Sequence, residues 1–183
     1  MPYKGQTFSN PNSGEVVEFI ETSKETNGSH VTLKSTLKQG GGFKVSHLHP
    51  SADEIFEVIS GTLSYQLNGV EGTVRAGEKI VLPKGQVHAH WNAQAEDLVM
   101  IQTITPSLDV DTFLETLFGL GADGRLDKTG QPPFLQIMIW LREVNNKTYL
   151  AAIPIGVQNF LAAILTPIAK LMGYRAFYPK YSK

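Results

Sequence analysis

The chain has 183 residues, of which 42% are hydrophobic and 18% are charged, a balance typical of a folded domain and not of a disordered one. Its formal net charge of −1 excludes a strongly basic surface, so we predict no nucleic-acid partner. There is no cysteine, which excludes disulfides and zinc–thiolate sites, and the first residues lack the apolar run of a secretory signal. We therefore expect a cytoplasmic protein.

Short segments of β-forming residues, separated by turn signals, dominate the chain as far as Pro106. Strands are predicted at 15–22 and 31–37, with the strong hairpin signal Asn27-Gly28 between them. Further strands are predicted at 43–49, 54–60, 63–68, 72–75, 79–82, 87–91 and 98–104. Many short strands at this spacing indicate an antiparallel sandwich or barrel.

Two histidines occupy alternate positions of one predicted strand, so His47 and His49 should project from the same face. Glu54 opens the next strand, and His88 lies on a later one. Three neutral imidazoles and one carboxylate suit a divalent transition metal (iron, manganese, nickel, cobalt, copper or zinc) and leave coordination positions open. We predict one such ion per chain, with these four side chains as its ligands.

A further histidine, His90, shares its predicted face with His88 and has three possible roles. It could be a fifth ligand, a candidate acid or base facing the substrate, or a plain solvated histidine. Glu57 falls on the strand face opposite Glu54, so we leave it out of the site. The candidate pocket-lining side chains are Phe43, Phe56, Tyr65 and Gln102.

After Pro106 the spacing of apolar residues changes from strand-like to helical. Helices are predicted at 109–120 and 134–144, and the second is apolar on nearly all sides, so it should be buried. We therefore predict a β-barrel domain at 1–106 and a helical C-terminal extension at 107–183.

A third, amphipathic helix is predicted from 156 to 173. Pro154 and Pro167 interrupt the apolar run 149–173 that contains this helix, so we expect neither a transmembrane span nor membrane contact, with an interfacial helix as the alternative. We expect it instead to pack on the barrel or on the second subunit of a homodimer. The residues predicted to make that contact are Phe160, Leu161, Ile164, Leu165 and Ile168.

Two spaced motifs resemble those of the cupin superfamily. The first is Gly41-x5-His47-x-His49-x4-Glu54-x6-Gly61, and the second is Gly77-x5-Pro83-x-Gly85-x2-His88-x3-Asn92. The resemblance implies a mainly β fold, a double-stranded β-helix or jelly-roll barrel, with a metal held in its mouth by the three histidines and the glutamate. It implies a structural role for Asn92. The whole chain is similar to small single-domain cupins of type 2 with C-terminal α-helices.

A cupin fold by itself leaves the reaction open. The leading hypothesis is a metal-dependent enzyme acting on a small organic molecule, with dioxygenase chemistry favoured over isomerisation or hydrolysis. The alternative is a non-catalytic cupin that binds or senses a small molecule.

Overall fold

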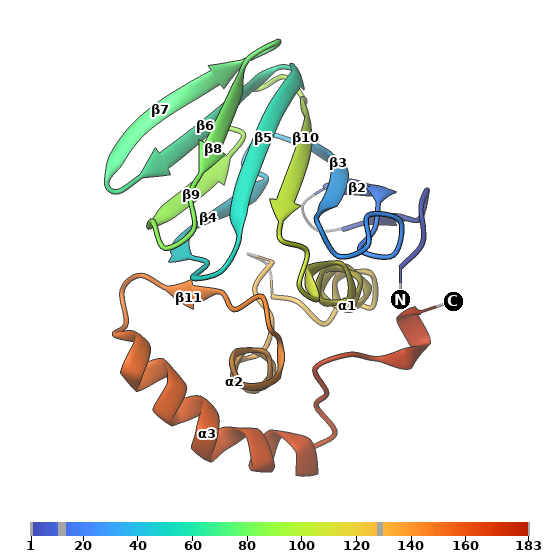
Figure 1. Cartoon of the computed structure of the whole chain (residues 1–183), viewed down its shortest axis with the longest axis vertical. Helices are drawn as coiled ribbons and strands as arrows, with labels where there is room; N and C mark the ends of the chain where they lie inside the picture. Colours follow the sequence, from blue (N-terminus) through green and yellow to red (C-terminus); the bar gives the residue numbers. More distant parts are fainter. Residues whose placement is uncertain (1, 11–13, 128–129, 183) are drawn as a thin grey trace.

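A computed structural model of the chain describes residues 2–10, 14–127 and 130–182. Two antiparallel sheets form the N-terminal part of the protein (Figure 1). The strands in chain order are β1 (Thr7–Ser9), β2 (Val16–Glu21), β3 (Val31–Leu37), β4 (Gly42–Leu48), β5 (Asp53–Ser60), β6 (Thr62–Leu67), β7 (Val70–Arg75), β8 (Lys79–Leu82), β9 (His88–Trp91), β10 (Leu98–Thr105) and β11 (Tyr149–Leu150). In the described residues, one sheet has the order β1-β2-β3-β10-β5-β8 and the other β11-β4-β9-β6-β7. This arrangement confirms the jelly-roll barrel.

Alternation of side chains along each strand builds the interior of the barrel. In β5, Glu54, Phe56 and Val58 point inward and are buried, whereas Glu57 between them is exposed, as predicted. Apolar side chains from both sheets fill the space between them, and they are Leu37, Phe56, Val58, Leu63, Val74, Leu82, Leu98 and Met100. The buried polar side chains of these strands and their ends include His47, His49, Glu54 and His88.

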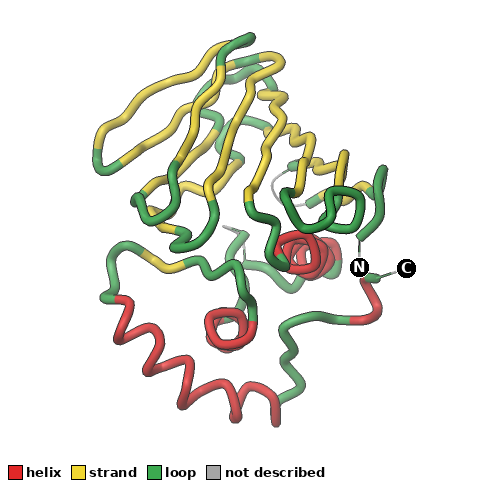
Figure 2. Tube along the Cα trace, viewed as in Figure 1, coloured by secondary structure: helices red, strands yellow, loops and turns green. Residues whose placement is uncertain are grey.

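The predicted helices are present as α1 (Val110–Ala122), α2 (Phe134–Glu143) and α3 (Ile155–Leu171), followed by a short 3-10 turn, η1 (Pro179–Tyr181). Figure 1 shows all of them at one end of the barrel, with α2 between the strands and α3, which lies outermost. Figure 2 shows that the strands precede the helices along the chain, except for β11, which lies between α2 and α3. That short strand returns from the extension to the edge of the barrel and pairs with β4.

Within one chain, only part of the packing face predicted for α3 is covered. Leu161 and Leu165 do pack against the extension's apolar cluster. Phe160, Ile164 and Ile168, however, are 64%, 50% and 47% exposed.

The inner face of α3 is lined by the buried residues Gln158, Ala162, Thr166 and Ala169. Alanine lets α2 and α3 approach closely, and the two polar side chains bond backbone carbonyl groups of neighbouring segments. Its largest apolar residues are therefore left on the outer face. None of the helices in the described part of the chain has the length and hydropathy that a membrane crossing requires.

The turn between β5 and β6 depends on glycine for two separate reasons. Gly61 has a φ of 81°, and a Cβ atom there would lie 2.6 Å from the carbonyl oxygen of Asp97. Gly77, in the turn between β7 and β8, has nearly the same φ, 84°, but a Cβ atom there would meet nothing within 4 Å. Comparing alanine substitutions at Gly61 and Gly77 therefore separates the effect of backbone strain from that of steric clash.

We predict that Gly61→Ala lowers the free energy of unfolding by more than Gly77→Ala. Both substitutions place alanine in the left-handed region, at about 1–2 kcal/mol, and only the first adds a clash of about 1–3 kcal/mol. Urea unfolding followed by circular dichroism measures the difference. Equal losses for the two variants would contradict the close approach of the 61 turn to Asp97.

Candidate metal centre

Four potential ligands meet at the end of the barrel that faces the helices. His47 on β4 lies directly opposite His88 on β9 in the five-stranded sheet, and His49 follows β4 by one residue. Glu54 comes from β5 in the other sheet. Each offers one ligand atom, and these four atoms lie within 4.8 Å of one another. The fold thus brings together the residues predicted from the sequence.

All three imidazoles are oriented by hydrogen bonds to backbone carbonyl groups. Nδ1 of His47 donates to the Val45 oxygen at 2.8 Å, and Nδ1 of His88 donates to the Gln86 oxygen at 2.9 Å. Nδ1 of His49 lies 3.2 Å from the carbonyl oxygen of Lys147. Because a carbonyl oxygen only accepts, each Nδ1 carries a proton, and Nε2 of the neutral imidazole is the nitrogen with the lone pair.

The inner atoms of the cluster fit a metal ion better than they fit each other. Glu54 Oε2 and His88 Nε2 are buried without a hydrogen-bond partner, and they are two of only four such side-chain atoms in the described residues. Nε2 of His49 and of His88 lie 3.4 and 3.6 Å from the Glu54 carboxylate. Metal–ligand bonds of about 2.1 Å put two ligands at most about 4.2 Å apart, so a slight contraction would close the cluster on an ion.

Burial and mutual charge set the protonation of this cluster. For Glu54, burial raises the pKa, but the neighbouring histidines, His49 first among them, more than reverse the effect and hold it well below its usual value. For His49, burial lowers the pKa and the Glu54 carboxylate raises it further than that, so the net shift is upward. Burial lowers the pKa of His47 well below its usual value. These shifts favour a protonated His49 beside an ionised Glu54, and a bound cation could take the place of that proton.

The structure places His90 beside the cluster and outside the four-ligand group. Its ring packs on Phe56 with centroids 4.6 Å apart, its Nδ1 is buried without a partner, and burial lowers its pKa to about 4. It is 8% exposed and so is not a solvated histidine. Its role as an acid or base stays a prediction.

The candidate pocket-lining residues lie around the ligands. Phe43 packs on His47 with ring centroids 4.3 Å apart, and Gln102 Nε2 lies 3.5 Å from Glu54 Oε1. Tyr65 pairs with His90 across β6 and β9.

Asn92, predicted to be structural, is fully buried and donates from Nδ2 to the carbonyl oxygens of Leu37 and Glu96 at 3.0 and 2.7 Å. Its Oδ1 accepts from the Gln94 amide at 2.9 Å. These bonds tie the end of β9 to two neighbouring segments, which agrees with the role predicted for this residue.

The sequence reasoning missed a contribution from residues 145–150, which we call the strap. The strap connects α2 to α3 and contains β11. Its Thr148 hydroxyl lies 3.3 Å from Nδ1 of His49, beside the Lys147 carbonyl. Only the β-forming run Thr148-Tyr149-Leu150 hints at this strand, and a run of that length is too short to be distinguished from a loop.

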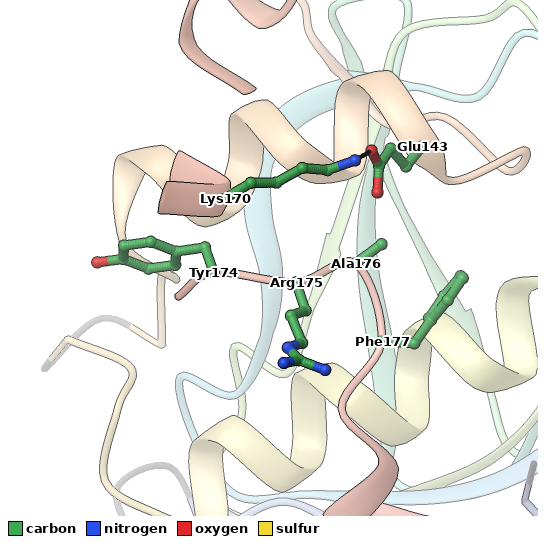
Figure 3. A pocket seen from close by; sticks show the side chains of 6 residues that line it. All are labelled: Glu143, Lys170, Tyr174, Arg175, Ala176 and Phe177. Atoms are coloured by element: carbon green, nitrogen blue, oxygen red, sulfur yellow. Dashed lines mark ion pairs between the residues drawn. The ribbon is translucent and has the colours of Figure 1, made fainter. Parts of the chain in front are cut away.

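A separate hollow of about 400 Å³ lies on the surface of the extension. Figure 3 shows Lys170 paired with Glu143 on one side of it and Arg175 from the C-terminal segment on the other. None of its lining residues belongs to the metal-ligand cluster. It carries no part of the chemistry considered below.

We predict that protein stripped of metal by a chelator loses stability as the pH falls from 6.5 towards 4. The folded-state pKa of His47 and His90 is lowered, so in this range the unfolded chain binds protons that the folded chain does not. The raised pKa of His49 acts above this range and does not oppose the loss. Burial raises the pKa of Glu15 to about 7, which opposes the loss, but by one group against two. Each such histidine should contribute a slope of up to about 1.4 kcal/mol per pH unit.

Thermal and urea unfolding across this pH range measure the slope. His90→Gln removes one titrating group and should reduce the slope, whatever it does to stability at neutral pH. A slope that is the same in the variant and the wild type would contradict a buried neutral His90.

Comparison with known proteins shows which family this chain resembles. Residues 33–104 match the family model described as cupin domain. The chain is 28% identical over 172 residues to a protein of Arthrobotrys oligospora named as an oxidoreductase, covering 85% of this chain and 66% of that one. It is 30% identical over 129 residues to oxalate oxidase 1 of Hordeum vulgare, covering 63% of each. The chain thus spans just under two thirds of the length of either relative.

A solved RmlC-like cupin from Shewanella frigidimarina shows 17% sequence identity and a TM-score of 0.49, covering 61% of this chain and 94% of that one.

Proposed function

The chain belongs to the cupin superfamily, and we propose that it binds one divalent transition metal and uses it to oxidise a small organic acid with dioxygen. The observation that carries the proposal is the convergence of three Nε2 atoms and one carboxylate, with each Nδ1 directed to a backbone carbonyl. An arrangement held from behind in this way is pre-organised for a cation. The ligands are His47, His49, Glu54 and His88.

A redox-active ion bound there would supply electron transfer between an organic substrate and dioxygen. The four protein ligands would leave two positions of a six-coordinate site free. They carry a single negative charge, so a divalent cation would leave the centre positive and attractive to an organic anion. The four ligand residues are only 1–6% exposed, which favours a small substrate.

Side chains around the ligands are placed to act on such a substrate. His90 is neutral at pH 7, because its pKa is about 4, and its free Nδ1 could accept a proton. Gln102 is close enough to Glu54 to hold the carboxylate in place. Phe43 and Phe56 form apolar walls against His47 and His90, and such walls keep water from the reacting groups.

Two relatives support oxidation over the other reactions that cupins could support, because one is named as an oxidoreductase and another as an oxalate oxidase. Oxalate is a small dianion and is therefore the first substrate to test. With dioxygen the balanced reaction takes oxalic acid and O₂ to two CO₂ and H₂O₂, in which the carbon–carbon bond breaks and two electrons and two protons pass to O₂. A dioxygenase would instead place both oxygen atoms in its organic product.

We predict that protein loaded with manganese or iron consumes O₂ with a small organic acid from a panel led by oxalate, and that zinc-loaded protein does not. Zinc has no accessible redox change, so it controls for binding without electron transfer. His49→Ala should lose most of its metal and its oxygen uptake. His90→Gln should keep the metal and turn over more slowly. An oxygen electrode and elemental analysis give both readouts.

Isotope labelling with ¹⁸O₂ distinguishes the oxidase from the dioxygenase, because only the dioxygenase labels the organic product. Compounds that raise the melting temperature of every metal form, with no oxygen uptake in any, would overturn the enzyme and favour a binding or sensing cupin. Wild-type protein that stays metal-free after reconstitution would overturn the metal site itself.

The outer face of α3 supports the homodimer predicted from the sequence. The exposed apolar side chains of this helix include Val157, Phe160, Ile164, Ile168 and Leu171. The sole charged residue of this helix, Lys170, is paired with Glu143 of its own chain. Two copies of such a face can meet around a twofold axis without contact between like charges. We therefore propose that α3 packs against α3 of a second copy.

We predict that Phe160→Glu weakens the dimer by at least about tenfold, because a buried aromatic side chain would be replaced by a charge in both copies. Sedimentation velocity over a range of concentrations measures the change. Val70→Glu is the matched control, since Val70 is 70% exposed on the far hairpin. A wild-type monomer would contradict the dimer, and a monomer that binds lipid vesicles through Phe160 would favour the interfacial helix.

A further inference from the structure

The strap (145–150) reaches the candidate metal centre from the far end of the sequence. β11 pairs with β4 so that Leu150 lies opposite His47 and Tyr149 lies opposite Leu48. Paired residues of adjacent strands point to the same side of a sheet, and alternate residues share a face. Leu150 and Thr148 therefore lie on the face of the sheet that carries His47 and His49.

The acceptor for His49 differs in origin from those of the other two histidines. His47 and His88 bond to carbonyl groups two residues earlier in their own segments. His49 bonds to Lys147, which is 98 positions away, and to the hydroxyl of Thr148. The orientation of two imidazoles is thus local, whereas the orientation of the third depends on the extension.

Contacts that do not involve His49 hold the strap in place. The carboxylate of Asp109, just before α1, accepts from the backbone amides of Asn145 and Asn146 at 2.8–3.0 Å. The buried amide of Gln158 on α3 accepts from Leu150 N at 3.1 Å and donates to the Leu150 oxygen at 2.9 Å. Because the strap is anchored at both ends, it can impose an orientation on the imidazole.

We propose that Thr148 is a positioning residue for the metal centre and that, with the Lys147 carbonyl, it fixes His49 with Nε2 towards the ion. Nδ1–H of His49 donates to these two acceptors, and that bond selects the tautomer whose Nε2 lone pair is free. The helical extension is then part of the metal site. The inference rests on the proposed role of His49 as a ligand.

The test compares Thr148→Val with Thr148→Ser in the full-length protein. Titration with Mn²⁺, followed by electron paramagnetic resonance of the free ion, gives the dissociation constant. Removing the hydroxyl should raise that constant about tenfold, because outer groups that orient a ligand have effects of this size. Serine keeps the hydroxyl and should restore binding to within about twofold of the wild type.

Thr166→Val is the matched control. Thr166 also lies in the extension, and its buried hydroxyl also bonds a backbone carbonyl, that of Met138 at 3.2 Å. It should change thermal stability and leave the Mn²⁺ dissociation constant unchanged. Weakening of Mn²⁺ binding by Thr166→Val as much as by Thr148→Val would overturn the positioning role, and so would unchanged binding in Thr148→Val.

A second readout needs no metal. Nitrogen-15 spectra of the imidazoles at about pH 9, where histidine is neutral, report the tautomer directly. His49, assigned by comparison with His49→Ala, should be protonated at Nδ1 in the wild type and in Thr148→Ser, with a larger Nε2–H fraction in Thr148→Val. An unchanged tautomer in Thr148→Val overturns the inference even if the wild-type protein binds no metal, an outcome that would separately overturn the proposed function.

Discussion

The candidate metal centre depends on hydrogen bonds that its imidazoles make away from the cluster. A histidine side chain can rotate and can carry its proton on either nitrogen, so a face with three histidines is not yet a site. Carbonyl oxygens of Val45, Gln86 and Lys147 remove both freedoms, because each can only accept. What remains is a set of Nε2 atoms and one carboxylate facing one another in a buried space.

Such a space is costly for the protein when no cation is present. Burying a carboxylate is unfavourable unless an opposite charge is near, and Glu54 obtains that charge from a protonated His49. The unpartnered atoms of Glu54 and His88 show that this pairing satisfies only part of the cluster. A divalent ion would satisfy all four ligands at once. The same reasoning explains why His90, which lies outside the ligand group, is neutral.

The helical extension contacts His49 through the strap and exposes apolar side chains on the outer face of α3. Its strap pairs with β4, while Gln158 and Thr166 turn inward to satisfy backbone carbonyl groups. Because small and polar residues of α3 face α2, Phe160 and the apolar residues next to it on the helix surface face outward. The arrangement connects the exposed apolar face of α3, through Gln158 and the strap, with His49.

The local features of this protein could be predicted from its sequence. Strand and helix follow from apolar periods of two and of three to four residues, which is why β5 buries Glu54 and exposes Glu57 as predicted. The motif spacing identified the four candidate ligands, and the structure brings them within 4.8 Å of one another. The inward or outward face of a strand residue depends only on its own segment.

Features that depend on contacts between distant segments could not be predicted in this way and became visible in the folded chain. Periodicity showed that α3 has an apolar face, but it could not show that α2 would pack instead against its small residues, such as Ala162. The ring of His90 packs on Phe56 from the other sheet. Thr148 meets His49 from 99 positions away, through a strand too short to carry a periodic signal. The acceptor that orients this candidate ligand was therefore visible only in the folded chain.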